Sequence, residues 1–157
     1  MQKILLSVIL EPLYRVLRVL ERRDGSVARK LQQLPDGACV RIRTSLTPDA
    51  PQLTVVHEGG ALRRADAAAE ADIEIAFKSL SGALRTFTGC ASIGQAYCAH
   101  RFVLKGNINE TMYLVRAIET AEGYLFPRFW NRRILKHRVE KRLPTLAVYA
   151  LALCGRS

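Results

Sequence analysis

The chain has 157 residues, of which 49% are hydrophobic and 24% are charged. This length and composition indicate one globular domain and exclude an intrinsically disordered chain. The net charge of +10 is uneven, because residues 123–157 carry eight Lys and Arg residues and a single acidic residue, Glu140. A basic block of this kind favours an anionic partner, either a membrane surface or nucleic acid.

The four cysteines show no Cys-x-x-Cys spacing, and no His lies at ligand spacing from them. We therefore expect no metal site, and reduced thiols in a cytoplasmic protein. The first twenty residues are apolar, but charged residues interrupt them and no small-residue cleavage site follows. We expect neither a signal peptide nor a transmembrane helix there.

The first predicted element is an amphipathic helix over residues 4–22, in which Pro12 would introduce a kink or divide the helix. Asp24-Gly25 then breaks the pattern, and Ser26 is a candidate N-cap for a short helix through Leu34. The apolar residues at helical spacing in the first helix are Ile4, Leu5, Val8, Ile9, Leu13, Val16, Leu17 and Leu20.

The period changes to two after the turn at Pro35-Asp36-Gly37, which predicts strands. Short turns between them indicate an antiparallel meander. The first strand has Val40, Ile42, Thr44 and Leu46 on one side, and the last has Ile73, Ile75 and Phe77. The predicted strands are Cys39–Leu46, Leu53–Glu58, Ala61–Ala65 and Asp72–Lys78.

Helices alternate with one more strand in the second half. Ser79 caps a helix that ends at Gly89, and Phe102–Lys105 forms a short strand. Asn109 caps a long helix that continues to Leu125. The predicted fold class is α+β, with a five-stranded, mainly antiparallel sheet covered on one face by helices and with extra N-terminal and C-terminal helices.

The segment 126–142 mixes cations with aromatic and aliphatic residues, a combination typical of a helix at an anionic lipid surface. A solvated helix packed by its apolar side, or a surface that binds nucleic acid or a protein, would have a similar composition. The apolar run 143–154 is too short to span a bilayer. The candidate membrane-contact residues are Phe126, Arg128, Phe129, Trp130, Arg132, Arg133 and Lys136.

Catalytic chemistry has little support in the sequence. The common hydrolase, zinc-protease and nucleotide-binding motifs do not occur. Cys98 and His100 lie close in sequence, but no third residue is evident that would orient them as a nucleophile and base. We expect no enzymatic activity and no cofactor.

The order of motifs between Asp72 and Glu119 resembles the sterol carrier protein type 2 domain family, which has bacterial members. An acidic residue opens the strand Asp72–Phe77, and the helical segment Leu80–Gly89 ends in glycine. The strand Arg101–Gly106 leads through Asn107 into the helix around Thr111–Ile118. The resemblance covers residues 26–122. It implies a five-stranded sheet, helices on one face and an apolar tunnel between the two layers.

The resemblance also implies a function without catalysis, since family members bind sterols, fatty acyl chains, phospholipids or isoprenoids. Some bacterial relatives serve ubiquinone biosynthesis. We therefore predict an N-terminal helix over 1–25, a lipid-binding domain over 26–125 and a basic extension over 126–157. The residues expected to line the tunnel are Phe77, Leu84, Phe87, Phe102, Leu104, Met112 and Val115.

The expected ligand is a lipid or an isoprenoid or quinone type of molecule. The expected location is the cytoplasm, at the inner face of a membrane, where the first helix and the extension would act as a door or an anchor. A protein partner or a homodimer is left open. The alternative function is that of a basic protein that binds nucleic acid or another protein through residues 126–142.

Overall fold

The computed structural model describes residues 1–125 and 144–153, and its elements follow the predicted order. The helices are α1 (Gln2–Arg23), α2 (Gly25–Leu31), α3 (Leu80–Phe87), α4 (Ile93–Cys98), α5 (Ile108–Leu125) and α7 (Thr145–Leu153). The strands are β1 (Cys39–Arg43), β2 (Gln52–Glu58), β3 (Ala61–Arg64), β4 (Ile73–Phe77) and β5 (Phe102–Lys105). The residues expected to contact a membrane, 126–136, lie outside the described residues.

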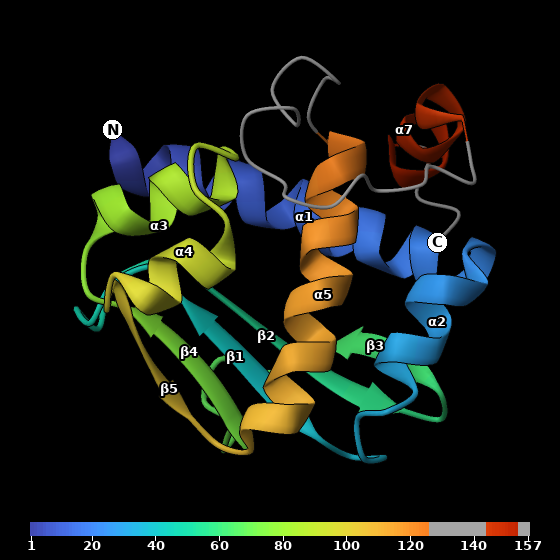
Figure 1. Cartoon of the computed structure of the whole chain (residues 1–157), viewed down its shortest axis with the longest axis horizontal. Coiled ribbons are helices and arrows are strands. Elements are labelled where there is room, and N and C mark those ends of the chain that lie inside the picture. Colours follow the sequence, from blue (N-terminus) through green and yellow to red (C-terminus); the bar gives the residue numbers. More distant parts are fainter. Residues whose placement is uncertain (126–143, 154–157) are drawn as a thin grey trace.

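The five strands form one sheet in the order β3-β2-β1-β4-β5, with the helices on one face (Figure 1). Every neighbouring pair is antiparallel except β1 and β4, which run parallel. The predicted α+β class and the mainly antiparallel sheet are confirmed. The expectation of a continuous meander was wrong for β4, because the chain crosses from β3 over β2 and β1 before it pairs.

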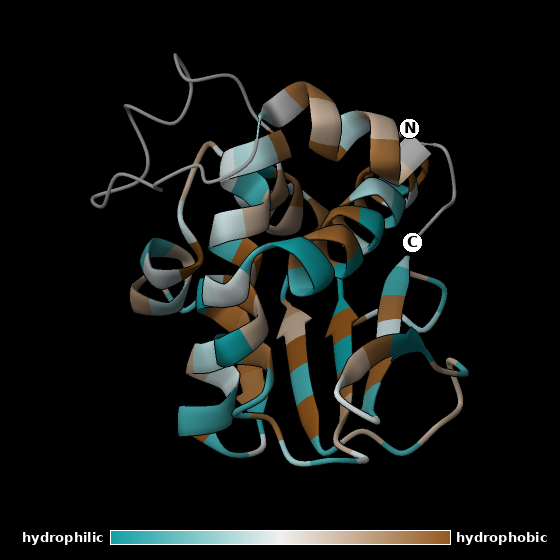
Figure 2. Ribbon diagram, turned by 90° about the vertical axis from the view of Figure 1, so that its right-hand side faces the viewer, coloured by the Kyte–Doolittle hydropathy of each residue, from teal (hydrophilic) through white to brown (hydrophobic). Residues whose placement is uncertain are grey.

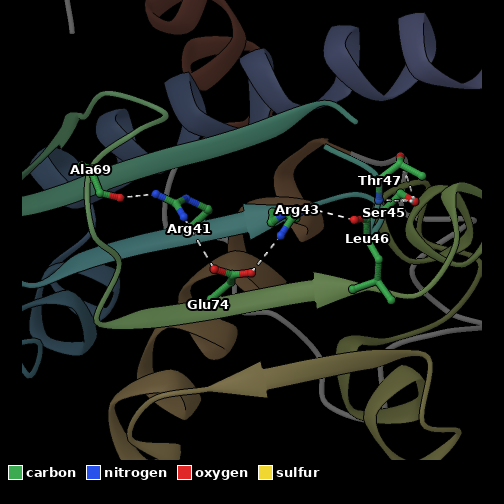
Figure 3. Close-up of polar contacts among 7 residues, drawn as sticks. All are labelled: Arg41, Arg43, Ser45, Leu46, Thr47, Ala69 and Glu74. Carbon is green, nitrogen blue, oxygen red and sulfur yellow. Dashed lines mark hydrogen bonds and ion pairs between the residues drawn. The ribbon is translucent and has the colours of Figure 1, made fainter. Parts of the chain in front are cut away.

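The crossover segment, residues 65–72, passes over the sheet face that lies away from the helices, where the Arg41 side chain of β1 bonds to it (Figure 3). The Arg41 guanidinium donates to the carbonyl oxygen of Ala69. At the end of the segment, Asp72 bonds to Cys39 twice, since its backbone N–H donates to the Cys39 carbonyl at 2.9 Å and its Oδ2 accepts the Cys39 N–H at 2.8 Å. These bonds bring the chain alongside β1 and start the parallel pair.

One carboxylate joins β1 to β4 on this outer face. Glu74 lies opposite Arg41 in the register, and its oxygens lie 3.6 Å from Arg41 Nη1 and 3.4 Å from Arg43 Nη1. Arg43 Nη2 also donates to the carbonyl of Leu46 at 3.1 Å (Figure 3). The three charged side chains are mostly buried, with 16–25% of their surface exposed.

The other face of the sheet is apolar and packs against the helices. Strand residues alternate between the two faces, which Figure 2 shows as brown and teal bands along the strands. Helices α1, α2, α3, α4, α5 and α7 contribute to the same hydrophobic cluster as the sheet. The sheet residues in this cluster are Val40, Ile42, Leu53, Val55, Leu62, Ile73, Ile75, Phe77 and Phe102.

Two helix caps differ from the predicted ones. Asp24, not Ser26, caps α2, since its Oδ1 accepts the Ser26 N–H at 2.9 Å. Asn107, not Asn109, caps α5, since its Oδ1 accepts the Asn109 N–H at 2.9 Å. In each case the true cap is an acidic or amide residue two positions earlier, which bonds to the backbone of the candidate predicted from sequence.

Helix α1 is a single element that contains Pro12, so the helix is not divided. Its inward side carries Leu6, Leu10, Leu13, Leu17 and Leu20, all nearly inaccessible to solvent. The expectation that Ile4, Leu5 and Val8 belong to this side was wrong, because they are 72%, 45% and 60% exposed. Apolar residues lie on more than one side of the start of α1, so the helical period alone does not reveal which side meets the sheet.

Leu46 was expected to continue the buried side of the first strand, but it is 52% exposed. Strand β1 ends at Arg43, and the chain bends away from the sheet before it reaches Leu46. Among the described residues, no helix has both the length and the hydropathy needed to cross a membrane.

Candidate functional site

Three phenylalanines from different elements meet between the sheet and the helices. The ring of Phe77 in β4 lies 5.4 Å from the ring of Phe87 in α3 and 5.4 Å from that of Phe102 in β5, measured between centroids. All three are buried, with exposures of 1%, 2% and 7%. The tilted and edge-on geometry is the favourable one for aromatic pairs. We call these three residues the aromatic cluster.

Short, well-capped helices hold this cluster in place. Ser79 Oγ accepts the N–H of Gly82 at the start of α3. At the start of α4, Ser92 and Gln95 form a reciprocal capping box. Because such short helices are marginal on their own, the caps and the packing of Phe87 and Ile93 together fix their positions.

The turn that leads from β5 into α5 depends on Gly106. Its φ of +109° is one that side-chain-bearing residues rarely adopt, and a Cβ at this position would collide with the carbonyl oxygen of Asp72. The close approach brings the end of β5 against the start of β4. It therefore also determines where α5 begins relative to the sheet.

The predicted lining residues fall into two groups. Phe77, Phe87, Phe102 and Val115 belong to the hydrophobic cluster, and Leu84 and Leu104 pack against it while half-buried. Met112, by contrast, is 45% exposed. The structure therefore brings six of the seven predicted residues into one apolar layer and leaves Met112 at its border.

Sequence reasoning missed two apolar residues at the same border. Tyr97 in α4 lies 5.7 Å from the Phe102 ring, yet it is 52% exposed. Ile108, one helical turn before Met112 in α5, is 58% exposed. We call Tyr97, Leu104, Ile108 and Met112 the apolar border. They follow each other closely along α4, β5 and the start of α5, so the layer reaches solvent at the β5 edge of the sheet.

Glu21 and Glu122 carry carboxyl groups that are buried in the helix layer. Burial raises the pKa of Glu21, whose two oxygens accept the Leu62 N–H at 3.1 and 3.0 Å. Burial, with a smaller contribution from the nearby charge of Glu119, raises the pKa of Glu122 well above the ordinary carboxyl value. Glu122 Oε1 has no hydrogen-bond partner among the described residues. Sequence reasoning missed Glu122, because a glutamate in an amphipathic helix such as α5 is ordinarily expected to be exposed.

No cluster of three or more potential metal ligands occurs within residues 1–125 and 144–153. Cys98 and His100, the candidate nucleophile and base, are both exposed at the end of α4. Cys98 and His100 therefore lie at the surface, whereas the aromatic cluster is buried.

No family model matches the chain, and no curated protein matches it either. Among solved structures, the chain is similar to a "UbiJ-SCP2 Ubiquinone synthesis protein", with 15% identity and a TM-score of 0.50 over 76% of this chain and 97% of that one. Sterol carrier protein 2 from Yarrowia lipolytica is also found, with 11% identity and a TM-score of 0.49 over 72% and 89% of the two chains. The sterol carrier protein domain 2 of Helicoverpa armigera follows, with 14% identity and a TM-score of 0.46 over 70% and 85%.

The UbiJ-SCP2 match covers about three quarters of this chain and nearly all of that one. The resemblance read from the motifs between Asp72 and Glu119 is thereby confirmed at the level of architecture. This chain has the fold of the sterol carrier protein type 2 domain.

Proposed function

We propose that this protein binds an apolar lipid without catalysis, in the layer between the sheet and the helices. The observation that carries the proposal is the aromatic cluster and its continuation to solvent at the apolar border. Sites for apolar ligands combine apolar and aromatic walls with few polar groups. Ile108 and Met112 add two exposed apolar side chains at the start of α5.

The ligand would enter at the apolar border and lie against Leu84, Leu104 and Val115, with the aromatic cluster at the far end. Transfer of an acyl or isoprenoid chain out of water contributes about 0.8 kcal/mol per buried methylene. Met112 would suit a gate position, because its flexible thioether side chain adapts to ligands of different shape.

The name of the UbiJ-SCP2 protein points to isoprenoid quinones as the first ligands to test. Fatty acyl chains, phospholipids and sterols are the other classes that the fold resemblance suggests. An accessory role in lipid or quinone metabolism would follow from binding a quinone precursor and presenting it to enzymes.

Native mass spectrometry of the protein purified from cells tests the proposal directly. We expect a co-purified lipid, and we expect the delipidated protein to take up a fluorescent fatty acid or a quinone analogue. Protein that is always empty, and that takes up neither probe, would refute lipid binding.

Two neighbouring residues of β5 offer a matched pair of variants. Leu104 faces the helices and Val103 faces the other side of the sheet, where it is 49% exposed. Leu104→Trp should fill the entrance and reduce probe uptake by about tenfold or more, a loss of about 1.4 kcal/mol of binding free energy. Val103→Trp should leave uptake unchanged. Equal uptake by both variants would place the ligand elsewhere.

We further propose that the protein works in the cytoplasm at an anionic membrane surface. The support is compositional: the segment 126–142, outside the described residues, is rich in cations and aromatic residues. Sedimentation with vesicles that contain phosphatidylglycerol tests this part. Binding to RNA or DNA with a steep salt dependence, and none to vesicles, would favour the alternative of a basic nucleic-acid-binding protein.

A further inference from the structure

A buried carboxyl group without a hydrogen-bond partner lies near the end of α5. Glu122 is only 5% exposed, and no described residue bonds to its Oε1. Buried polar groups in folded proteins are nearly always paired, because an unpaired one has lost its bonds to water and gained none in return. A partner that the folded chain does not itself supply, such as a group on a bound ligand, would account for this exception.

The surroundings of Glu122 favour its neutral form. Burial, with a smaller contribution from the negative charge of Glu119, raises its pKa well above the ordinary carboxyl value. A neutral carboxyl group has an O–H that donates a hydrogen bond and a carbonyl oxygen that accepts one. A hydroxyl group on a ligand can fill both roles, whereas an anionic head group would be repelled by Glu119.

Glu122 shares one side of α5 with residues already assigned to the candidate site. Ile108, Val115 and Glu122 follow each other at intervals of seven residues, which return to nearly the same side of a helix. Ile108 belongs to the apolar border, and Val115 belongs to the hydrophobic cluster. This row is about 21 Å long. It therefore leads from the solvent-exposed border to the unpaired carboxyl group.

Other helices enclose the end of α5. Both α1 and α7 contact α5 in this region, and the Tyr149 hydroxyl of α7 donates to the Leu125 carbonyl oxygen (Figure 1). Helix α7 also packs on α1, where Val16 and Val19 of α1 and Val148 of α7 are buried. A polar group on a ligand that reaches Glu122 would thus be paired in an environment from which water is largely excluded, where a hydrogen bond is strong.

From this arrangement we infer that Glu122 binds a hydroxyl group on the head of the ligand, so that the ligand is a long apolar molecule with a neutral alcohol or phenol head. Its chain would pack against the aromatic cluster and Val115, with the head beyond Val115 at Glu122. The carboxyl group would act as a specificity determinant, because a site that bonds to a hydroxyl discriminates against an analogue without one. The inference rests on the proposed lipid-binding function and specifies the class of ligand.

Displacement of a bound fluorescent fatty acid by 4-dodecylphenol and by dodecylbenzene tests the inference. The two competitors have the same ring and chain, and they differ only in the hydroxyl group. We expect the wild type to bind 4-dodecylphenol about tenfold more tightly, because dodecylbenzene leaves the Glu122 carboxyl unpaired. The ratio of the two affinities does not depend on how tightly the fluorescent reporter itself is held.

Three variants locate the origin of this preference. Glu122→Leu should bind the two competitors equally, whereas Glu122→Gln should keep the preference, since its amide also donates and accepts. Glu70→Leu is the matched control at an exposed position and should behave as the wild type does. The melting temperature of Glu122→Leu should be no lower than that of the wild type, because the substitution removes an unpaired buried polar group. A lost preference then cannot be attributed to misfolding.

Equal affinity of the wild type for the two competitors would overturn the inference and leave lipid binding intact. A preference that persists in Glu122→Leu would place the hydroxyl contact at another residue. An equal loss in Glu122→Gln and Glu122→Leu would mean that an ionised carboxylate makes the contact, which contradicts a neutral head group. If native mass spectrometry shows no complex of the wild type with the fatty acid or with either competitor, the proposed function is refuted, and this inference with it.

Discussion

At the scale of single residues, Gly106 shows how a backbone requirement positions the candidate site. The turn it occupies joins β5, which carries Phe102 and Leu104, to the start of α5, which carries Ile108 and Met112. The positive φ and the contact with Asp72 leave no room for a side chain. The Gly-Asn pair was visible in the sequence as a turn, but the close approach to Asp72 depends on strands far apart in the chain.

Gly106→Ala should therefore destabilise the protein. We expect a loss of about 1 kcal/mol or more in the free energy of unfolding, because alanine is strained at this φ and its Cβ meets backbone. Urea denaturation measures the change. Gly25→Ala is the control, since a Cβ at Gly25 would meet no atom within 4 Å and the φ of this residue is not positive. An equal loss in both variants would contradict the explanation.

At the scale of elements, the arginine–glutamate contacts on the outer face stabilise the parallel pair of β1 and β4. Arg41 and Arg43 share Glu74, and both also donate to backbone carbonyls of the segments that cross or leave the sheet. Alternation in the sequence identified both strands but not their pairing, because an antiparallel neighbour and a parallel one need the same pattern of apolar residues.

Glu74→Gln should weaken this junction. Two largely buried guanidinium groups would lose their shared carboxylate, and we expect a destabilisation of about 1–3 kcal/mol. Glu58→Gln provides the comparison, because the Glu58–Arg63 pair is mostly exposed and its 3.9 Å separation is long. Its expected effect is within about 0.5 kcal/mol in thermal or urea unfolding. Similar effects of the two substitutions would argue against a role for Glu74 in holding β4.

Helix α1 shows a second limit of prediction from sequence, which concerns the side of a helix that faces the sheet. Its helical period and its extent were predictable from the apolar residues, yet the side that faces the sheet was assigned incorrectly at Ile4, Leu5 and Val8. The helical period does not identify the inward side where apolar residues lie on more than one side of a helix. The aromatic cluster was easier to predict, since Phe77 continues the alternation of Ile73 and Ile75 and is buried with them.

At the scale of the whole molecule, the buried carboxyl of Glu122 links stability to pH. A pKa raised in the folded state means that the folded protein holds a proton which the unfolded chain releases. This contribution is fully present below the ordinary carboxyl pKa. It is lost as the pH rises through the higher folded-state value.

Glu122→Gln should remove that dependence. We expect a higher melting temperature than the wild type at neutral and alkaline pH, and a flatter curve of melting temperature against pH on the acidic side. Glu70→Gln, at an exposed position, should leave both unchanged. Melting curves recorded across this pH range measure the effect, and parallel curves for wild type and Glu122→Gln would show that Glu122 is not the group responsible.

The overall architecture was predictable because each strand, turn and helix is encoded in its own stretch of the sequence. The order of these elements along the chain then indicates an α+β sheet with a helical cover. What sequence reasoning did not provide depends on contacts across the molecule: the β1–β4 pairing, the exposure of Met112 and the exposure of Ile4, Leu5 and Val8. The apolar border was partly missed for the same reason, since Tyr97 and Ile108 look like ordinary core residues in a linear pattern.

The packing of α7 on α1 has a consequence for how the protein is made. Helix α7 follows α1 and the whole sheet in the chain, so Val16 and Val19 stay uncovered during synthesis until α7 has emerged. Up to that point the nascent chain presents the outward side of α1 to solvent. A chaperone that meets the chain in this interval would contact a longer apolar surface than the folded protein offers.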